Sequence, residues 1–319
     1  MTGHRKPKAP TRDVSPFCSD TDYFCPTGTS LANLACFEQS GFATLHGHSD
    51  HISAYDYCWL LSDSRWAWEF LRRNEDFLRD ANLRSADDLS FVPACHQITL
   101  VRPRNAQTLA ERWGLAFFPE PEHDGLEADA IWSGGIYSRR VHTHIAPRAP
   151  NEASEIYDRT VAICRITHFT DMAGREHLLL KGNGCVIQVI CTGMSLLARE
   201  PVKLSMVIDS LDEFQTKLKT LQRAQRVYDP QAEAEIPEWT RHSLALRNAL
   251  VALDCHDAGK TYFETAAFIY GEARARAAWD SPSRAMKDEM KRALARAKEL
   301  RDGGYASLLG PVQNALELA

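Results

Sequence analysis

The feature that most constrains the fold of this 319-residue chain is a pair of apolar helical patterns separated by a short break. The first pattern places Leu244, Leu246, Ala249, Leu250 and Leu253 at helical spacing and ends near Cys255. Residues 257–259 (Asp-Ala-Gly) interrupt it. A second, shorter helix is expected from Thr261, with Tyr262, Ala266, Ile269 and Tyr270 on one face and Gly271 as its stop. Two short helices joined so tightly indicate the first half of a helix-turn-helix.

A third helix is expected immediately downstream. Asp280 is a capping residue type and Pro282 suits a first-turn position, so the helix should begin there and run to about Arg301. Gly303 can then supply the left-handed residue that commonly closes a helix. One side of this helix is apolar, with Met286, Met290, Ala293, Leu294, Ala297 and Leu300. The opposite side carries a basic stripe of Arg284, Lys287, Lys291 and Lys298.

Charge is distributed unevenly along the chain. The segment 271–301 holds nine basic and five acidic residues, a net of +4, whereas the whole chain is at −5 and the remainder is therefore at −9. Such a pattern suits an electrostatic footprint for DNA phosphates that is confined to one module. The alternative is a solvated amphipathic helix, because any surface helix shows a charged outer face.

The candidate DNA contacts follow from this basic stripe. Residues in the N-terminal half of a recognition helix usually enter the major groove, which favours Arg284, Lys287 and Lys291, with Arg292 and Lys298 further along. A competing assignment makes 272–279 the recognition helix, with Arg274 and Arg276 reading bases. The short turn at Tyr270-Gly271 favours that version, and the cap at 280–282 favours the first. Three residues at the start of the second helix complete the candidate set: Lys260, Thr261 and Tyr262.

The segment from Tyr55 to Asp80 is the first predicted folded element. Ser62 can cap a helix whose wide buried face holds Trp66, Ala67, Phe70, Leu71, Asn74, Phe77 and Leu78. Three arginines lie beside this face: Arg72, Arg73 and Arg79. They can contact DNA or a partner, or they can form ion pairs with Glu69, Glu75 and Asp76, and we favour the ion pairs.

Between Gln97 and Val227 the pattern changes from helix to strand. Five segments are rich in β-branched and apolar residues: 97–102, 160–169, 176–181, 185–191 and 202–208. The Gly182-Asn183-Gly184 sequence predicts a hairpin between two of them. Ser210 and Glu213 form a capping-box pattern for a helix that carries Leu211, Phe214, Leu218 and Leu221. We therefore expect a small, mainly antiparallel sheet with at least one packed helix.

Three stretches of the chain resemble known families. The run from Tyr262 to Gly271, then Trp279, then the basic helix ending at Gly303-Gly304-Tyr305 with Leu308-Leu309, resembles the RovC-like DNA-binding domain of proteobacterial transcription factors. Residues 174–180 and 196–221 look like the β-rich part that precedes it. The run Trp66-Ala67-Trp68-Glu69-Phe70-Leu71-Arg72-Arg73-Asn74 is similar to the signature of the transcriptional regulator-like domain of related proteins. One position departs from the family, because Phe263 stands where members usually carry a polar or basic residue.

The resemblance implies a DNA-binding transcriptional regulator, an activator of secretion-system or conjugative-element genes. The expected fold class is α+β, divided into an extension (1–50), a helical regulator-like segment (51–95), a β-rich middle domain (96–237) and a helix-turn-helix domain (238–319). Because one module covers a short DNA site, we expect a homo-oligomer held by the N-terminal and β-rich parts. RNA polymerase or an anti-activator protein are further candidate partners. The rival hypothesis is a protein-binding adaptor or anti-activator without direct DNA contact.

Composition and motifs exclude several other classes. Apolar and charged fractions of 44% and 25% are those of an ordinary soluble protein, and no apolar run approaches the roughly 20 residues that span a bilayer. With no signal-peptide pattern and an odd number of cysteines, nine, we expect reduced thiols in a cytoplasmic, nucleoid-associated protein. No nucleophile elbow, phosphate loop or His-Glu-x-x-His motif is present, so we expect no enzyme and no cofactor.

The sequence contains two groups of possible metal ligands. Residues 1–50 contain Cys18, Cys25, Cys36, His46 and His48, followed by His51, but no pair has the short Cys-x2-4-Cys spacing of a structural zinc site. His142 and His144 alternate and would share one side of a strand, but no third ligand lies nearby in the sequence. We therefore expect no metal site, and we expect residues 1–50 to form a mobile or partly docked extension.

Overall fold

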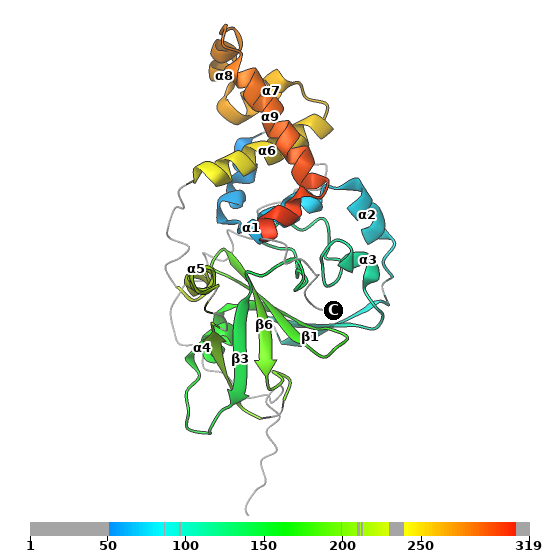
Figure 1. The fold of residues 1–319 in the computed structure, drawn as a ribbon, viewed down its shortest axis with the longest axis vertical. Helices are drawn as coiled ribbons and strands as arrows, with labels where there is room; N and C mark the ends of the chain where they lie inside the picture. The colour runs from blue at the N-terminus through cyan, green and yellow to red at the C-terminus, as the bar shows by residue number, and fades with distance from the viewer. Residues whose placement is uncertain are drawn as a thin grey trace, which may run out of the picture.

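The computed structural model describes residues 51–310 apart from positions 86, 96, 199, 209–210, 212 and 230–238. The molecule is elongated, with a β-sheet toward one end and a group of helices at the other (Figure 1). The expectations for the 1–50 extension and for the capping box at Ser210 lie outside the described residues.

The N-terminal segment contains three helical elements: η2 (Ile52–Leu60), α1 (Asp63–Leu71) and α2 (Glu75–Asn82). All side chains from Ser64 to Leu71 are buried, which confirms the wide buried face expected here. Ser62 is the N-cap residue of α1, but its hydroxyl contacts Ser64 Oγ rather than a backbone N–H. The prediction of a single helix that continues through Asn74 is wrong. The Asn74 side chain accepts the Phe77 N–H, so Asn74 is the N-cap residue of a second helix, α2.

The middle of the chain forms one seven-stranded sheet of order β1-β2-β4-β5-β6-β3-β7. Its strands are β1 (Leu89–Cys95), β2 (Ile98–Pro103), β3 (Val141–Pro147), β4 (Arg165–Thr170), β5 (Glu176–Gly182), β6 (Cys185–Gly193) and β7 (Val202–Val207). Four neighbouring pairs are antiparallel, and β2·β4 and β3·β6 are parallel. The α+β class and the mainly antiparallel sheet are therefore confirmed, and the sheet begins at Leu89.

The hairpin between β5 and β6 is present. Gly182 pairs with Cys185, so only Asn183 and Gly184 form the loop, and both have positive φ, at 49° and 64°. This is the backbone that Asn-Gly turns favour. The expected strand from Thr160 is wrong at its start, because residues 155–163 form α4 (Glu155–Ile163). Thr160 Oγ1 donates to the Ile156 carbonyl, a bond available only within a helix turn.

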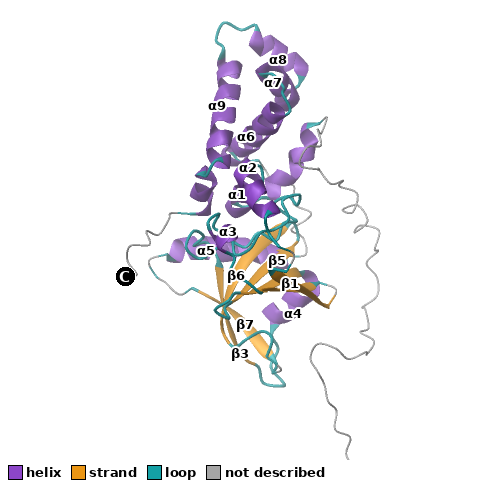
Figure 2. Ribbon diagram, turned by 90° about the vertical axis from the view of Figure 1, so that its right-hand side faces the viewer, coloured by secondary structure: helices purple, strands orange, loops and turns teal. Residues whose placement is uncertain are grey.

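The two faces of the sheet are covered differently. One face packs against the segment after α3 (Thr108–Glu111), where Phe117 and Ile131 contact Val101, Phe169 and Leu179. The other face carries α4, α5 (Phe214–Gln225) and η3 (Arg226–Tyr228), as Figure 2 shows for α4 and α5. No helix within the described ranges is both long and apolar enough to cross a membrane.

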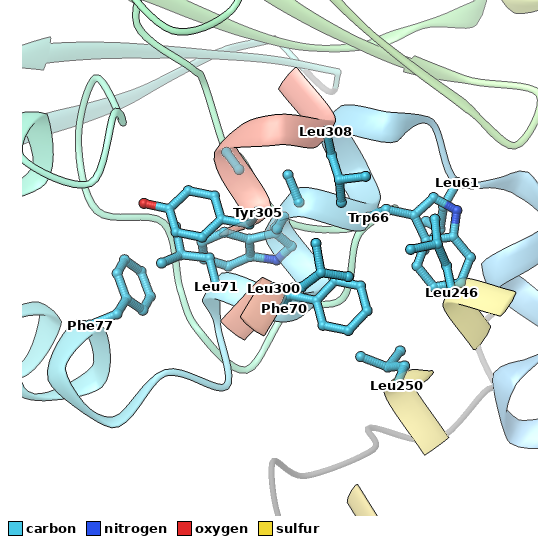
Figure 3. Close-up of a cluster of buried hydrophobic side chains, with 14 of the residues drawn as sticks. Leu61, Trp66, Phe70, Leu71, Phe77, Leu246, Leu250, Leu300, Tyr305 and Leu308 are labelled. Carbon is cyan, nitrogen blue, oxygen red and sulfur yellow. The ribbon is translucent and has the colours of Figure 1, made fainter. Parts of the chain in front are cut away.

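The remaining elements are α6 (Arg241–Asp257), α7 (Tyr262–Tyr270), α8 (Glu272–Trp279), α9 (Ala285–Arg301) and η4 (Gly304–Leu309). The largest apolar core of the described chain joins these C-terminal helices to α1. Figure 3 shows Trp66 and Phe70 of α1 packed beside Leu246 and Leu250 of α6 and Leu300 of α9. The N-terminal and C-terminal segments therefore share one core, although about 180 residues separate them in the chain.

Candidate nucleic-acid interface

Helices α6 to α9 surround a second, smaller core of their own. Its buried members are Val251, Cys255, Ala266, Ile269, Ala275, Met286 and Met290, so each of the four helices contributes at least one side chain. This unit stands at the end of the molecule away from the sheet (Figure 1). A small helical unit with its own core holds its surface side chains in fixed positions, which a recognition surface requires.

The turn between α6 and α7 forms as the sequence predicted. Gly259 has φ +75°, and Thr261 is the N-cap residue of α7. Thr261 Oγ1 accepts the Glu264 N–H at 3.3 Å, and Glu264 Oε2 accepts the Thr261 N–H at 2.7 Å. This reciprocal capping box satisfies two backbone donors at the start of α7.

Gly271 alone connects α7 to α8, with φ +86° and ψ 146°. That region of backbone space is essentially restricted to glycine. The segment 272–279, considered as the competing recognition helix, is helical. The predicted start of the third helix is wrong, because Asp280 ends α8 by donating its N–H to the Ala278 and Arg276 carbonyls. Residues 281–284 form a turn, and α9 begins at Ala285 instead of Pro282.

The N-terminus of α9 has two unusual features. Arg284, its N-cap residue, adopts the left-handed conformation with φ +52° and ψ 11°, and its own side chain makes no capping hydrogen bond, whereas Ser283 Oγ accepts the Ala285 N–H at 3.5 Å. A non-glycine residue in this region is uncommon and costs conformational energy, and such residues cluster at functional sites. The other backbone N–H groups of the first turn and the positive end of the helix dipole together favour a phosphate.

The two faces of α9 separate apolar from basic side chains as predicted. Met286, Met290, Leu294, Ala297 and Leu300 are buried. Arg284, Lys287, Lys291 and Arg292 are exposed. Lys287 lies over the Trp279 ring at 5.9 Å. Arg284, Lys291 and Arg292 have no ion pair, hydrogen bond or ring contact with other side chains among the described residues, so their charges are available to an external anion.

The other candidate residues already have partners within the unit. Arg276 pairs with Glu272 at 2.5 Å, and Arg274 lies over the Tyr270 ring at 5.0 Å. Lys260 lies over the Phe268 ring at 5.0 Å, and Lys298 Nζ is 2.9 Å from His256 Nε2. Thr261 is engaged in the capping box, and Tyr262 is 37% exposed.

Three aromatic residues of this unit have structural roles that the sequence pattern did not reveal. The Phe263 and Trp279 rings meet edge to face at 5.4 Å, which joins α7 to the end of α8. The Tyr270 hydroxyl donates to Glu289 Oε1 and accepts from Asn248 Nδ2, so it connects α7 with α9 and α6. Phe263 therefore packs inside the unit, which explains an apolar residue at that position.

Arg73 and Asn74, which follow α1, attach this helical unit to the rest of the molecule. Arg73 Nε donates to Asp254 Oδ1 of α6 at 2.6 Å, and its Nη1 donates to Glu69 Oε2 at 2.7 Å. Arg72 Nε also donates to Glu69 Oε2, at 2.8 Å. Asn74 Nδ2 donates to the Arg301 carbonyl at the end of α9. These ion pairs confirm the preferred interpretation of Arg72 and Arg73, and Arg79 pairs with Asp76.

Burial by itself would raise the pKa of Glu69, but the charges of Arg72 and Arg73 and their hydrogen bonds dominate and lower it to about 2. Glu69 is therefore ionised at neutral pH in a fully buried position, and its Oε1 accepts the Gly125 N–H. Removing one of the arginines that pair with this buried charge should therefore strongly destabilise the fold.

No group of three or more His, Cys, Asp or Glu side chains is placed to hold a metal ion within the described ranges. His142 and His144 lie on β3. Cys58, Cys164, Cys185, Cys191 and Cys255 are free thiols.

Two family models match the chain. Residues 207–310 match the RovC DNA-binding domain, described as "T6SS, Transcription factor, DNA binding domain". Residues 50–118 match the "Proteobacterial transcriptional regulator-like domain". No curated protein matches the chain at a significant level. The two matched segments include all of α6 to α9 and all of α1 and α2. The chain therefore combines a regulator-like domain at its N-terminal side with a RovC DNA-binding domain at its C-terminal side.

Proposed function

We propose that this protein activates transcription by binding duplex DNA in a sequence-directed manner with the helix-turn-helix-like unit α6 to α9, and that α9 is its recognition helix. The observation that carries this proposal is the start of α9, where Arg284 holds a left-handed backbone beside exposed Lys287, Lys291 and Arg292. Phosphate contacts from these cations would set the register of the helix, and one or two of them would reach base edges.

The partners of the basic side chains favour α9 over α8. Both arginines of α8 are engaged, with Glu272 and with the Tyr270 ring. Moving either onto a phosphate would first break that contact. In addition, α8 has 8 residues and α9 has 17, so α9 offers a longer basic surface to a groove.

The test is fluorescence anisotropy of labelled duplex DNA that carries the gene's own upstream region, with a scrambled duplex for comparison. The wild type should prefer the upstream duplex. Combined Arg284→Ala, Lys287→Ala and Lys291→Ala changes should weaken binding and make the log-log salt slope shallower by up to about 0.9 for each lost phosphate contact.

A matched control removes three exposed cations elsewhere: Arg79, Arg159 and Lys219. It changes the net charge by the same amount, so its affinity should remain close to that of the wild type. Equal losses in both triple variants would show that only net charge matters. Absence of binding to any duplex at low salt would overturn direct DNA recognition and favour an adaptor or anti-activator that contacts a protein.

The target genes and the assembly state are part of the same proposal. The description of the matched DNA-binding family names a T6SS transcription factor, so we propose secretion-system genes as targets, with conjugative-element genes as the other class. A reporter fused to such a promoter should lose expression in the triple variant. We also propose a cytoplasmic homo-oligomer, because one module covers a short site, and light scattering of the purified protein measures its mass directly.

A further inference from the structure

A cavity of about 360 Å³ lies on the sheet face that carries α4. Figure 1 shows α4 toward the end of the molecule opposite α7 and α8. Its walls come from β1, β2, β4, β5, β7, α4 and the loop after β6. Apolar side chains dominate the lining, and His168 and Thr160 are among the few polar ones. This volume falls in the range of pockets that bind small molecules.

The strand register orders this face from apolar to polar. Ile98 is opposite Ile166, and in the next row Leu100 is opposite His168, which is opposite Leu178. One further row along the same face, Thr170 is opposite Glu176, and Arg102 follows Leu100 on β2 by two residues. Residues two apart in a strand share a face. These last three residues line an adjoining open polar pocket, which shares Leu197 with the cavity.

Two buried polar atoms between the cavity and the polar pocket lack hydrogen bonds. His168 is 3% exposed, and its Nε2 has no hydrogen-bond partner, although Glu176 Oε2 lies at an ion-pair distance of 3.4 Å. Thr170 Oγ1 is likewise buried without a partner. Buried polar atoms are nearly always satisfied, so two such atoms at one place indicate a missing ligand group.

The charges around the polar pocket favour a negatively charged group. Asp171 is paired with Arg175 at 2.6 Å, and both Glu176 oxygens accept hydrogen bonds from residues 195 and 196. Arg102 is exposed and has no ion pair or hydrogen bond from its side chain within the described ranges. Glu176 keeps its negative charge and faces His168 at 3.4 Å, so Arg102 is the charged lining residue that no described carboxylate engages.

We propose that this face is a binding site for an amphipathic small molecule whose apolar body fills the cavity and whose anionic head, such as a carboxylate, contacts Arg102, Thr170 and His168. The site is separate from the DNA-binding surface, so it does not rest on the proposed function.

The probe is 1-anilinonaphthalene-8-sulfonate, an apolar fluorophore with one anionic group, titrated into the full chain. It should bind at one site per chain, and decanoate should displace it at concentrations about tenfold or more below those of decyltrimethylammonium, which has the same alkyl chain and the opposite charge. Equal displacement by the two compounds, or no binding of the probe, would overturn the proposal.

Two pairs of variants locate the site. Val161→Trp on α4 should fill the cavity and abolish binding of the fluorophore, whereas Ile163→Trp, on the same helix but outside the lining, should not. Both positions are at least 36% exposed, so neither change forces a larger side chain into a core. Arg102→Ala should weaken the affinity for decanoate about tenfold or more, and Arg104→Ala should leave that affinity unchanged. Fluorophore binding that appears only as an oligomer dissociates on dilution would assign the cavity to a second copy of the chain.

Discussion

Two arginine-containing helical regions of this molecule carry similar charges and use them in opposite ways. At the end of α1, Arg72 and Arg73 are 4% and 12% exposed and are held by Glu69 and Asp254. At the start of α9, Arg284, Lys291 and Arg292 are exposed and unpaired within the described chain. The difference shows that a basic residue in a DNA-binding protein can be assigned to the DNA surface only when its partners within the protein are known.

The buried ion pairs and hydrogen bonds also connect the two matched family domains. Asp254 belongs to α6, and the Arg301 carbonyl that Asn74 contacts ends α9, so the N-terminal signature attaches to both long helices of the DNA-binding unit. Trp66 and Phe70 add apolar contacts to the same helices (Figure 3). The regulator-like domain and the DNA-binding unit are therefore joined by polar and apolar contacts at the same two helices.

The largest expected effect is on stability. Arg73→Ala leaves Asp254 and buried Glu69 with fewer partners and should lower the free energy of unfolding by about 3–5 kcal/mol. Arg79→Ala removes an arginine that is 68% exposed and should cost at most about 1 kcal/mol. Urea denaturation measures both. Equal losses in the two variants would remove the distinction between the buried and exposed arginines.

The same cluster predicts a dependence on pH. Because its neighbouring arginines hold the pKa of Glu69 at about 2 in the folded state, below its ordinary 4.5, ionised Glu69 stabilises the fold by an amount on the order of 3 kcal/mol above pH 4.5. That stability is lost as the pH falls from 4.5 through 2. Glu69→Gln should flatten unfolding free energy against pH in this window. Glu122→Gln, at an exposed carboxylate, controls for the loss of one charge.

These buried ion pairs show where sequence reasoning stops. Helices α6 and α7, the start of the second near Thr261, and the β5–β6 hairpin depend on neighbouring residues and were predicted. Strands β1 and β3 were not among the predicted strands, since β3 joins the sheet through β6 and β7, more than 40 residues away. Asp254 lies 181 residues from Arg73, so no local spacing indicates their contact. The sequence predicted the basic stripe of α9, but it did not indicate that Arg284, Lys291 and Arg292 lack ion pairs within the described chain.

A smaller effect separates α8 from α9 in DNA binding. Lys291→Ala with Arg292→Ala removes two unpaired cations and should reduce the salt slope by up to about 0.9 per contact, with a matching loss of affinity. Arg274→Ala with Arg276→Ala also removes two charges, but these side chains are engaged with Tyr270 and Glu272 and should matter less. Anisotropy titrations at several salt concentrations compare them. A larger loss in the α8 pair would make α8 the recognition helix.

The smallest effect concerns Thr261, which is both a candidate DNA contact and the cap of α7. Because Thr261 caps α7, Thr261→Ala removes the acceptor of the Glu264 N–H and should lower the free energy of unfolding by about 1 kcal/mol. Thr261→Ser keeps the hydroxyl and should retain most of that stability. Since a protein that remains folded under assay conditions presents the same α9 surface, DNA affinity should be unchanged in both variants. A loss of affinity in Thr261→Ala without a loss of stability would instead place Thr261 on the DNA and bring the start of α7 into the interface beside α9.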